Sequence, residues 1–305
     1  MRLRTYEATE AAGAAPQLGM ERNGRIVPLH GVSDVAAFFS LPAETRTRLA
    51  RDAETALAKD LGAPAASVKT LLPVLDPRKV ICVGLNYRDH AAEQNLEIPK
   101  APALFPKYAS SLVAHGEPIE LPRESAKVDY EAELVLVIGS RADHVSLDDA
   151  WSVVGGLTIG NDVSVRDYQG ATTQWMNGKI FDRTTPVGPV VVTPDEFPDP
   201  ADLEIWLEIG GEVLQRSRTS QFVFDVPQMI EYVTRMTTLE PGDLIFTGTP
   251  GGVGFLRKPR RYLQDGETVT VYVEGIGTLV NPVKAPEGGA APDLLPKPRR
   301  EERTA

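Results

Sequence analysis

Two carboxylates spaced two residues apart form the most chemically suggestive feature of this 305-residue chain. Glu131 and Glu133 lie within residues 128–138, a run that is otherwise largely apolar. Side chains two residues apart on a β-strand project from the same face, so the two carboxylates would lie side by side. The run is apolar on both of its faces, which is typical of a strand that is buried on both sides.

Two interpretations of this acidic pair are open. Buried neighbouring carboxylates repel each other and lose hydration, so they need a proton, a base or a cation. A hard divalent cation, which prefers oxygen ligands, would satisfy them. Alternatively, Glu131 and Glu133 lie with Asp129 at an exposed strand end. The local pattern does not separate the two interpretations.

Composition limits the classes of partner and compartment. The net charge of −10 argues against nucleic acid and anionic membrane surfaces as partners. No apolar run reaches the length of a membrane span, and the first residues lack the apolar core of a signal peptide. Cys82 is the only cysteine, which excludes an intrachain disulfide and a thiolate metal cluster. We therefore expect a cytoplasmic location.

The chain divides into three regions. Residues 1–72 show short strand signals and an amphipathic helix, which predicts a small N-terminal α+β domain. Within it, Asn23 and Gly24 predict a hairpin turn. Residues 73–283, which alternate many strand signals with short helices, form a second and larger region. Residues 284–305 combine proline, glycine and clustered charge, which predicts a disordered tail.

A second candidate for chemistry is the pair His90 and Glu93. Residues three apart are neighbours on a helix surface, and residues 86–93 are expected to form a short helix. A carboxylate beside an imidazole orients the ring and raises its basicity, as general base catalysis requires. The alternative is an ordinary surface ion pair.

Further polar residues follow the next predicted strand. Asp162 would supply a third oxygen ligand, although its type and position slightly favour a helix N-cap. If the chain turns helical after it, Arg166 and Gln169 share one face. Lys179 is surrounded in sequence by apolar residues, so burial beside an acidic cluster is plausible, and its charge would offset surplus negative charge there.

Residues 248–254 form a glycine-rich loop that includes Thr249. Such a loop exposes backbone N–H groups and permits close approach of a ligand. It lacks the Gly-Lys-Ser/Thr ending of a phosphate-binding P-loop and the glycine spacing of a dinucleotide-binding turn. The loop therefore gives no support to a nucleotide-binding module.

Five short stretches, taken in order, resemble the fumarylacetoacetate hydrolase family over roughly residues 73–283. Each motif is weak alone, but their order and spacing together are specific. They are Val83-Gly84 with Asn86-Tyr87 and His90, Asp129-Tyr130-Glu131 with Glu133-Leu134, Asn161-Asp162-Val163 with Arg166-Asp167, Lys179 with Phe181-Asp182, and Gly242-Asp243 with Thr247-Gly-Thr-Pro250.

The resemblance implies a β-rich mixed α/β fold whose catalytic domain is usually a homodimer. It also implies that this domain holds Mg²⁺, Mn²⁺ or Ca²⁺ through Glu131, Glu133 and Asp162. It implies that His90 and Glu93 form the acid/base pair of a mobile lid. The residues at positions that contact substrate in the family are Arg166, Gln169, Lys179 and Thr249. Val165 and Ile180 depart from the alanine and serine common in the family, which bears on substrate choice more than on metal binding.

The activity predicted on this basis is cleavage of a C–C bond in a small 2,4-dioxo acid of the acylpyruvate or fumarylpyruvate type. The 2-oxo carboxylate would chelate the metal, which would stabilise the enolate left by bond cleavage. Lys179 would add positive charge at the developing oxyanion, and His90, oriented by Glu93, would activate water. The alternatives are an oxaloacetate-type decarboxylase, a 2-oxo-acid hydratase or isomerase, and a non-enzymatic protein with a structural cation.

Overall fold

The computed structural model describes residues 1–8 and 14–289, so the predicted tail at 284–305 lies mostly outside the described part. The described residues of its first region contain five strands and two α-helices. The hairpin predicted at Asn23 and Gly24 is confirmed, because both have positive φ angles (50° and 74°) and Arg22 pairs with Arg25. The elements are β1 (Arg2–Ala8), β2 (Gln17–Arg22), β3 (Arg25–Pro28), α1 (Val35–Phe39), α2 (Ala43–Ala58), β4 (Ala63–Pro64) and β5 (Val68–Thr70).

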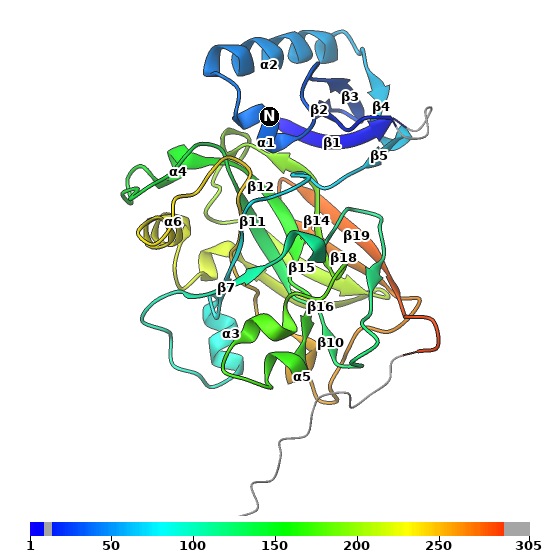
Figure 1. The fold of residues 1–305 in the computed structure, drawn as a ribbon, viewed down its shortest axis with the longest axis vertical. Helices are drawn as coiled ribbons and strands as arrows, with labels where there is room; N and C mark the ends of the chain where they lie inside the picture. Colours follow the sequence, from blue (N-terminus) through cyan, green and yellow to red (C-terminus); the bar gives the residue numbers. More distant parts are fainter. Residues whose placement is uncertain (9–13, 290–305) are drawn as a thin grey trace, which may run out of the picture.

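The strands of this first region join the main sheet of the molecule. β1 runs antiparallel to β14, with Leu3 opposite Val191, so one continuous sheet crosses both regions (Figure 1). The order is β4-β3-β2-β1-β14-β12-β11-β17-β6-β7, with β5 on β1 and β8 on β14. The strands added here are β6 (Val80–Gly84), β7 (Ala103–Lys107), β8 (Leu112–Val113), β11 (Ala132–Ile138), β12 (Val154–Asn161), β14 (Thr185–Val192) and β17 (Leu244–Phe246).

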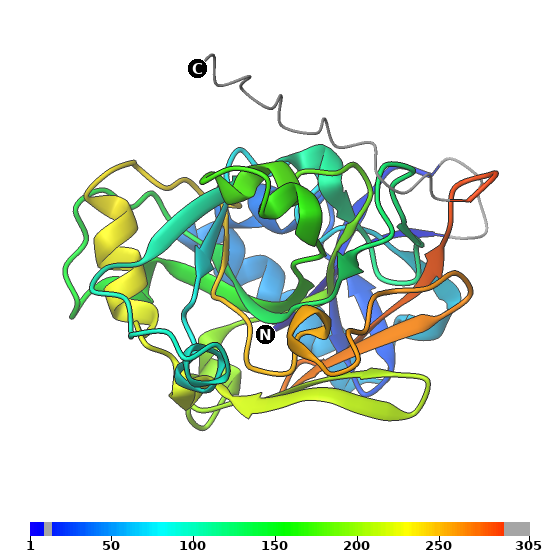
Figure 2. The same cartoon turned by 90° about the horizontal axis from the view of Figure 1, so that it is seen from below.

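A second sheet covers one face of the first. Figure 2 shows its orange and yellow-green strands below the green strands of the main sheet. Its order is β16-β15-β18-β19-β9, and a separate short pair joins β10 to β13. The bounds are β9 (Ile119–Glu120), β10 (Val128–Asp129), β13 (Ser164–Val165), β15 (Glu204–Ile209), β16 (Glu212–Arg218), β18 (Thr268–Val273) and β19 (Gly277–Lys284).

Strand β11 lies between two hydrophobic cores. Leu134 and Leu136 pack with residues of the second sheet, whereas Val135 and Val137 pack into a core shared with the first region. Every residue of β11 is buried. The prediction of a strand buried on both faces is therefore confirmed, although the strand is interrupted at Tyr130 and resumes at Ala132.

The remaining α-helices of the described residues are short. They are α3 (Arg88–Glu93), α4 (Ala150–Val153), α5 (Arg166–Gln169) and α6 (Val226–Thr234). Ser146 Oγ donates to the Asp149 carboxylate at 2.8 Å in a turn, and α4 begins directly after Asp149. No helix in the described residues is long and apolar enough to span a membrane.

Replacing Leu136 with alanine tests the burial of β11. The side chain is fully buried, so the cavity should lower the free energy of unfolding by about 2–5 kcal/mol in urea denaturation. Leu147→Ala is the control, because Leu147 is 46% exposed and its loss should change that free energy by less than about 0.5 kcal/mol. Equal effects of the two changes would contradict the described core.

Candidate active site

Three carboxylates meet at the start of β11. Ligand atoms of Glu131, Glu133 and Asp162 all lie within 4.8 Å of one another, and all three residues are buried. The pairing of β11 with β12 brings them together, because Ala132 lies opposite Asn161. The alternatives of an exposed strand end and of a helix cap at Asp162 are both wrong, since Asp162 is fully buried and α5 follows Val165.

Buried cations balance two of these carboxylates. Lys179 Nζ lies 2.7 Å from Glu131 Oε2 and 2.7 Å from Asp162 Oδ2. The second oxygen of Asp162 accepts from Lys107 Nζ at 2.7 Å, and both side chains are fully buried. Burial opposes the charge on Lys179, but attraction to Asp162 and Glu131 outweighs it and raises the pKa of the ammonium.

Glu133 has a different environment. Its Oε2 accepts from the backbone N–H of Gly248 at 2.7 Å, and no ion pair within 4.0 Å joins it to a cation in the described chain. Burial, and then the charges of Asp162 and Glu131, raise the pKa of Glu133 well above its ordinary value. A buried carboxylate that lacks a cationic partner, beside two others, fits a divalent cation held by oxygen ligands.

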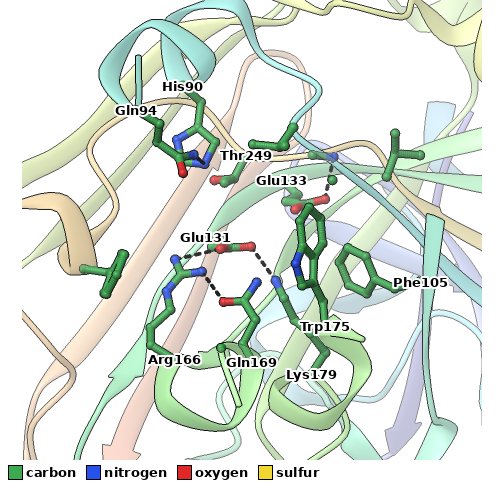
Figure 3. Close-up of a pocket in the computed structure, with 16 residues that line it drawn as sticks. His90, Gln94, Phe105, Glu131, Glu133, Arg166, Gln169, Trp175, Lys179 and Thr249 are labelled. Carbon is green, nitrogen blue, oxygen red and sulfur yellow. Dashed lines mark hydrogen bonds and ion pairs between the residues drawn. The ribbon is translucent and has the colours of Figure 1, made fainter. Parts of the chain in front are cut away.

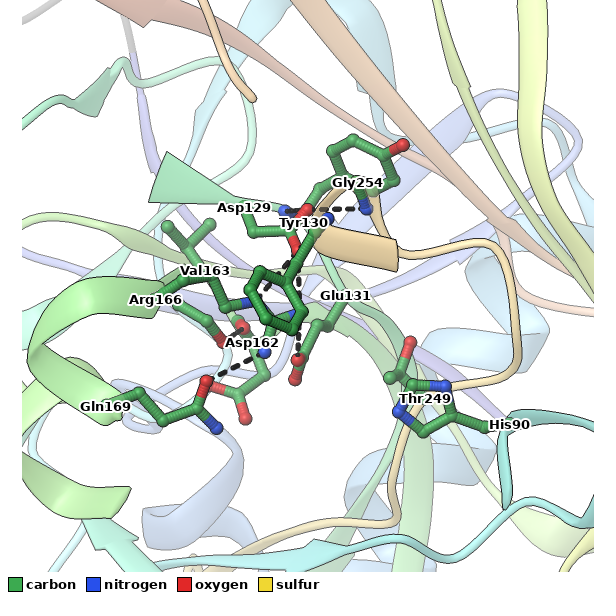
Figure 4. A network of polar contacts seen from close by, with 12 residues as sticks. His90, Asp129, Tyr130, Glu131, Asp162, Val163, Arg166, Gln169, Thr249 and Gly254 are labelled. Atoms are coloured by element: carbon green, nitrogen blue, oxygen red, sulfur yellow. Dashed lines mark hydrogen bonds and ion pairs between the residues drawn. The ribbon is translucent and has the colours of Figure 1, made fainter. Parts of the chain in front are cut away.

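Asp129 organises the other side of the cluster (Figure 4). It accepts from the backbone N–H groups of Gly254 and Phe255 at 2.8 and 2.9 Å, and from Arg166 Nε at 2.7 Å. Arg166 Nη2 also lies 2.7 Å from Glu131 Oε1. A single buried carboxylate therefore fixes both Arg166 and the loop that carries Phe255.

Helix α3 carries both His90 and Glu93. His90 Nδ1 lies 3.6 Å from Glu93 Oε2, which is longer than a hydrogen bond, and Gln94 Nε2 lies 2.9 Å from His90 Nε2. Glu93 also accepts from the backbone N–H of Gly252 at 3.0 Å. The His90 ring and then this N–H lower the pKa of Glu93 despite partial burial, so the carboxylate stays ionised beside the imidazole.

A cavity of about 230 Å³ separates His90 from the carboxylates (Figure 3). One wall is aromatic, with Phe105 and Trp175 edge to face at 5.9 Å between ring centroids. Trp175 packs so closely on Gly84 that a Cβ there would lie 2.2 Å from the indole ring. The Lys179 ammonium lies 4.9 Å from the Phe105 ring centroid, so this wall also touches the charged cluster.

The structure brings all nine predicted site residues together. Those that line the cavity are His90, Glu131, Glu133, Arg166, Gln169, Lys179 and Thr249. Glu93 and Asp162 lie behind them, in contact with His90 and Lys179 respectively. The shared face predicted for Arg166 and Gln169 is confirmed by a 2.9 Å hydrogen bond between their side chains.

Sequence reasoning missed Lys107 and gave Asp129 no role. Lys107 is the last residue of the short strand β7. A lysine at a strand end is usually exposed, so nothing in the sequence indicated that it lies in the site. Its partner Asp162 is 55 positions away, so no local pattern connects them. Asp129 did stand in one of the family motifs, and this was the available signal for its part in the site.

The raised pKa of Glu133 predicts that cation binding is coupled to proton release. Below that pKa the carboxyl must lose a proton when Mn²⁺ binds, so the apparent affinity should rise with pH by up to about tenfold per unit. Isothermal titration calorimetry in buffers of different ionisation enthalpy measures both quantities. Glu133→Gln should bind Mn²⁺ more weakly and without this slope, whereas a wild-type affinity independent of pH would contradict the assignment.

The sequence and the fold are both similar to known proteins. The family model described as "Fumarylacetoacetate (FAA) hydrolase C-terminal" matches residues 79–284. The bovine protein named oxaloacetate tautomerase FAHD2A, mitochondrial, is 42% identical over 294 residues, covering 93% of this chain and 91% of that protein.

Two solved structures extend the comparison. The 2-hydroxyhepta-2,4-diene-1,7-dioate isomerase of Mycobacterium marinum is 36% identical with a TM-score of 0.73, over 93% of this chain and 98% of that one. The maleylpyruvate hydrolase of Sphingobium sp. SYK-6, in complex with manganese(II) and pyruvate, is 28% identical with a TM-score of 0.76, over 93% and 99%. The chain therefore belongs to the fumarylacetoacetate hydrolase family.

Proposed function

We propose that this protein is a divalent-metal-dependent keto–enol tautomerase of a small 2-oxo dicarboxylic acid, with oxaloacetate as the substrate to test. The observation that carries the proposal is the placement of one imidazole, His90, across a small cavity from three clustered carboxylates. The relatives named oxaloacetate tautomerases, at 41–42% identity, support this choice of reaction over the hydrolysis predicted from the sequence.

Tautomerisation needs a base and a positive charge beside the 2-oxo oxygen, but no water. Mg²⁺ or Mn²⁺ bound by Glu131, Glu133 and Asp162 would supply that charge. The His90 imidazole takes the proton from C3 and returns it to the 2-oxo oxygen, so that the keto and enol forms interconvert without gain or loss of atoms. Glu93 stabilises the imidazolium formed in between.

The cavity suits a compact anion. Its volume of about 230 Å³ and its aromatic wall leave little room beyond a short chain. Arg166 and Lys179 bring positive charge to its floor, and Gln169 and Thr249 add neutral hydrogen-bonding groups. A 2-oxo dicarboxylate presents oxygen atoms at both ends, which matches polar groups on opposite sides of the cavity.

Hydrolysis of a 2,4-dioxo acid is the second candidate. The contact between His90 and Glu93 would equally activate a water molecule, and the maleylpyruvate hydrolase shares the fold. An isomerase acting on a longer dioic acid would use the same groups. A purely structural cation site would leave His90 and the cavity without a role, which disfavours it.

Replacing His90 with alanine separates these possibilities. With oxaloacetate and Mn²⁺, the His90→Ala variant should convert enol to keto, followed by ultraviolet absorbance, about 10²–10⁴-fold more slowly, while its affinity for Mn²⁺ stays unchanged. His144→Ala is the matched control, because the His144 side chain is 72% exposed. Undiminished tautomerisation by the His90 variant would refute the role of this base, and turnover of acylpyruvates alone would favour hydrolysis.

Two further expectations remain proposals. We infer a homodimer and a cytoplasmic location from the resemblance and the composition, whereas the bovine relative is named as a mitochondrial protein. Sedimentation of the purified chain and localisation of a tagged copy address them directly.

A further inference from the structure

Gln215 points inward because of an irregularity in strand β16. Along β15 and β16 the register shifts, so that Leu207 pairs with Gln215 but Glu208 pairs with Val213. Leu214 is the extra residue of this bulge, and Leu214 and Gln215 are both buried although they are consecutive. Such a bulge re-aims a side chain that regular alternation would turn to solvent.

Two backbone groups fix the orientation of the Gln215 amide. Its Oε1 accepts from the backbone N–H of Ala132 at 2.9 Å, and Ala132 lies between Glu131 and Glu133. Its Nε2 donates to the backbone carbonyl of Pro250 at 2.9 Å. A backbone N–H can only donate and a carbonyl can only accept, so the reversed amide would lose both bonds.

The same Nε2 donates its second proton to Thr249 Oγ1 at 2.9 Å. The Thr249 hydroxyl accepts this hydrogen bond, so the proton of the hydroxyl is not used in the contact with Gln215. Among the described residues no acceptor takes that proton, and Thr249 lines the cavity beside His90 (Figures 3 and 4). The hydroxyl proton is therefore available to a molecule in the cavity.

We propose that Gln215 is a positioning residue that makes Thr249 a hydrogen-bond donor to a carboxylate oxygen of the substrate. The inference rests on the proposed function only in requiring an anionic 2-oxo acid. With the amide held by Ala132 and Pro250, one lone pair of the Thr249 hydroxyl is occupied and its proton is free to point into the cavity. A free hydroxyl proton favours an anionic oxygen, which accepts a strong hydrogen bond.

A purely structural role for Gln215 predicts a different outcome. Gln215 also joins β16 to β11 and to the glycine-rich loop, so its loss alone would not identify the hydroxyl as the target. The two roles separate in a double-mutant cycle, since coupling through Thr249 disappears when the residue at that position has no hydroxyl.

The cycle uses Thr249→Val, Gln215→Met and the double variant, each assayed with Mn²⁺ and oxaloacetate. Thr249→Val should raise KM about tenfold with kcat nearly unchanged, as loss of a hydrogen bond to a charged group does. Gln215→Met should raise KM about fivefold when Thr249 is present and less than about twofold in the Thr249→Val background. Equal effects of Gln215→Met in both backgrounds would overturn the proposal.

Binding of pyruvate to the Mn²⁺-loaded protein, measured by calorimetry, gives a readout that does not depend on turnover. If Gln215→Met weakens pyruvate binding only when Thr249 is present, the positioning role is supported. This holds even if oxaloacetate is not converted, and in that case only the proposed reaction fails. Additive losses in the pyruvate Kd, or failure of the wild-type protein to bind pyruvate, overturn the positioning role. The Mn²⁺ affinity should be equal in all four proteins, and a fall confined to the Gln215 variants would show that Gln215 acts on the carboxylates instead.

If the Gln215→Met variant does not fold, Gln215→Glu takes its place in the double-mutant cycle. It keeps the acceptor for the Ala132 N–H, and its ionised carboxylate would accept the Thr249 proton instead of directing it to the cavity. Pyruvate binding should then weaken about tenfold with Thr249 present and change less than about twofold in the Thr249→Val background. The measurement is made at pH 9, where the introduced carboxylate is ionised. If Gln215→Glu binds pyruvate with the wild-type Kd at this pH, the inference is contradicted.

Discussion

The ion pairs of Lys179 with Glu131 and Asp162 are the interaction on which this site depends. Taking a carboxylate or an ammonium out of water costs several kcal/mol, and only close opposite charges and hydrogen bonds offset it. Lys107 and Arg166 extend the compensation, since each pairs with a further oxygen of the same two carboxylates. Glu133 is left as the acidic group for which a cation is the natural partner.

This arrangement demands an accurate strand register. Ala132 lies opposite Asn161, and the Asn161 side chain accepts from the backbone N–H of Glu131 at 2.9 Å. A slip of one residue between β11 and β12 would reverse the faces of every side chain on one strand and separate the carboxylates. The two hydrophobic cores on either side of β11 prevent that slip, because it would exchange leucine and valine layers that are each closely packed. The apolar residues of β11 thus fix the register that holds the carboxylates together.

The sequence allowed most of the site to be predicted but little of its surroundings. Glu131 and Glu133 are two residues apart, so their side chains project from the same face of any β-strand. The ordered family motifs identified the other site residues. Lys107 was missed because its partner is remote in sequence, and Gln215 because period-two alternation places it outside. A bulge is set by how two strands fit together in space, so pattern reading on one strand could not find it. The continuous sheet was likewise missed, since pairing between β1 and β14 leaves no local trace.

That pairing of β1 with β14 has a consequence for synthesis of the chain. Arg2 and Leu3 of β1 are made long before their partners in β14 (residues 185–192), so this part of the β1 edge lacks its partner while the intervening residues are made. Contacts between such distant segments also slow folding, because the long loop must close before they form. The contact between the two regions of the main sheet therefore cannot form until residues 185–192 have been made.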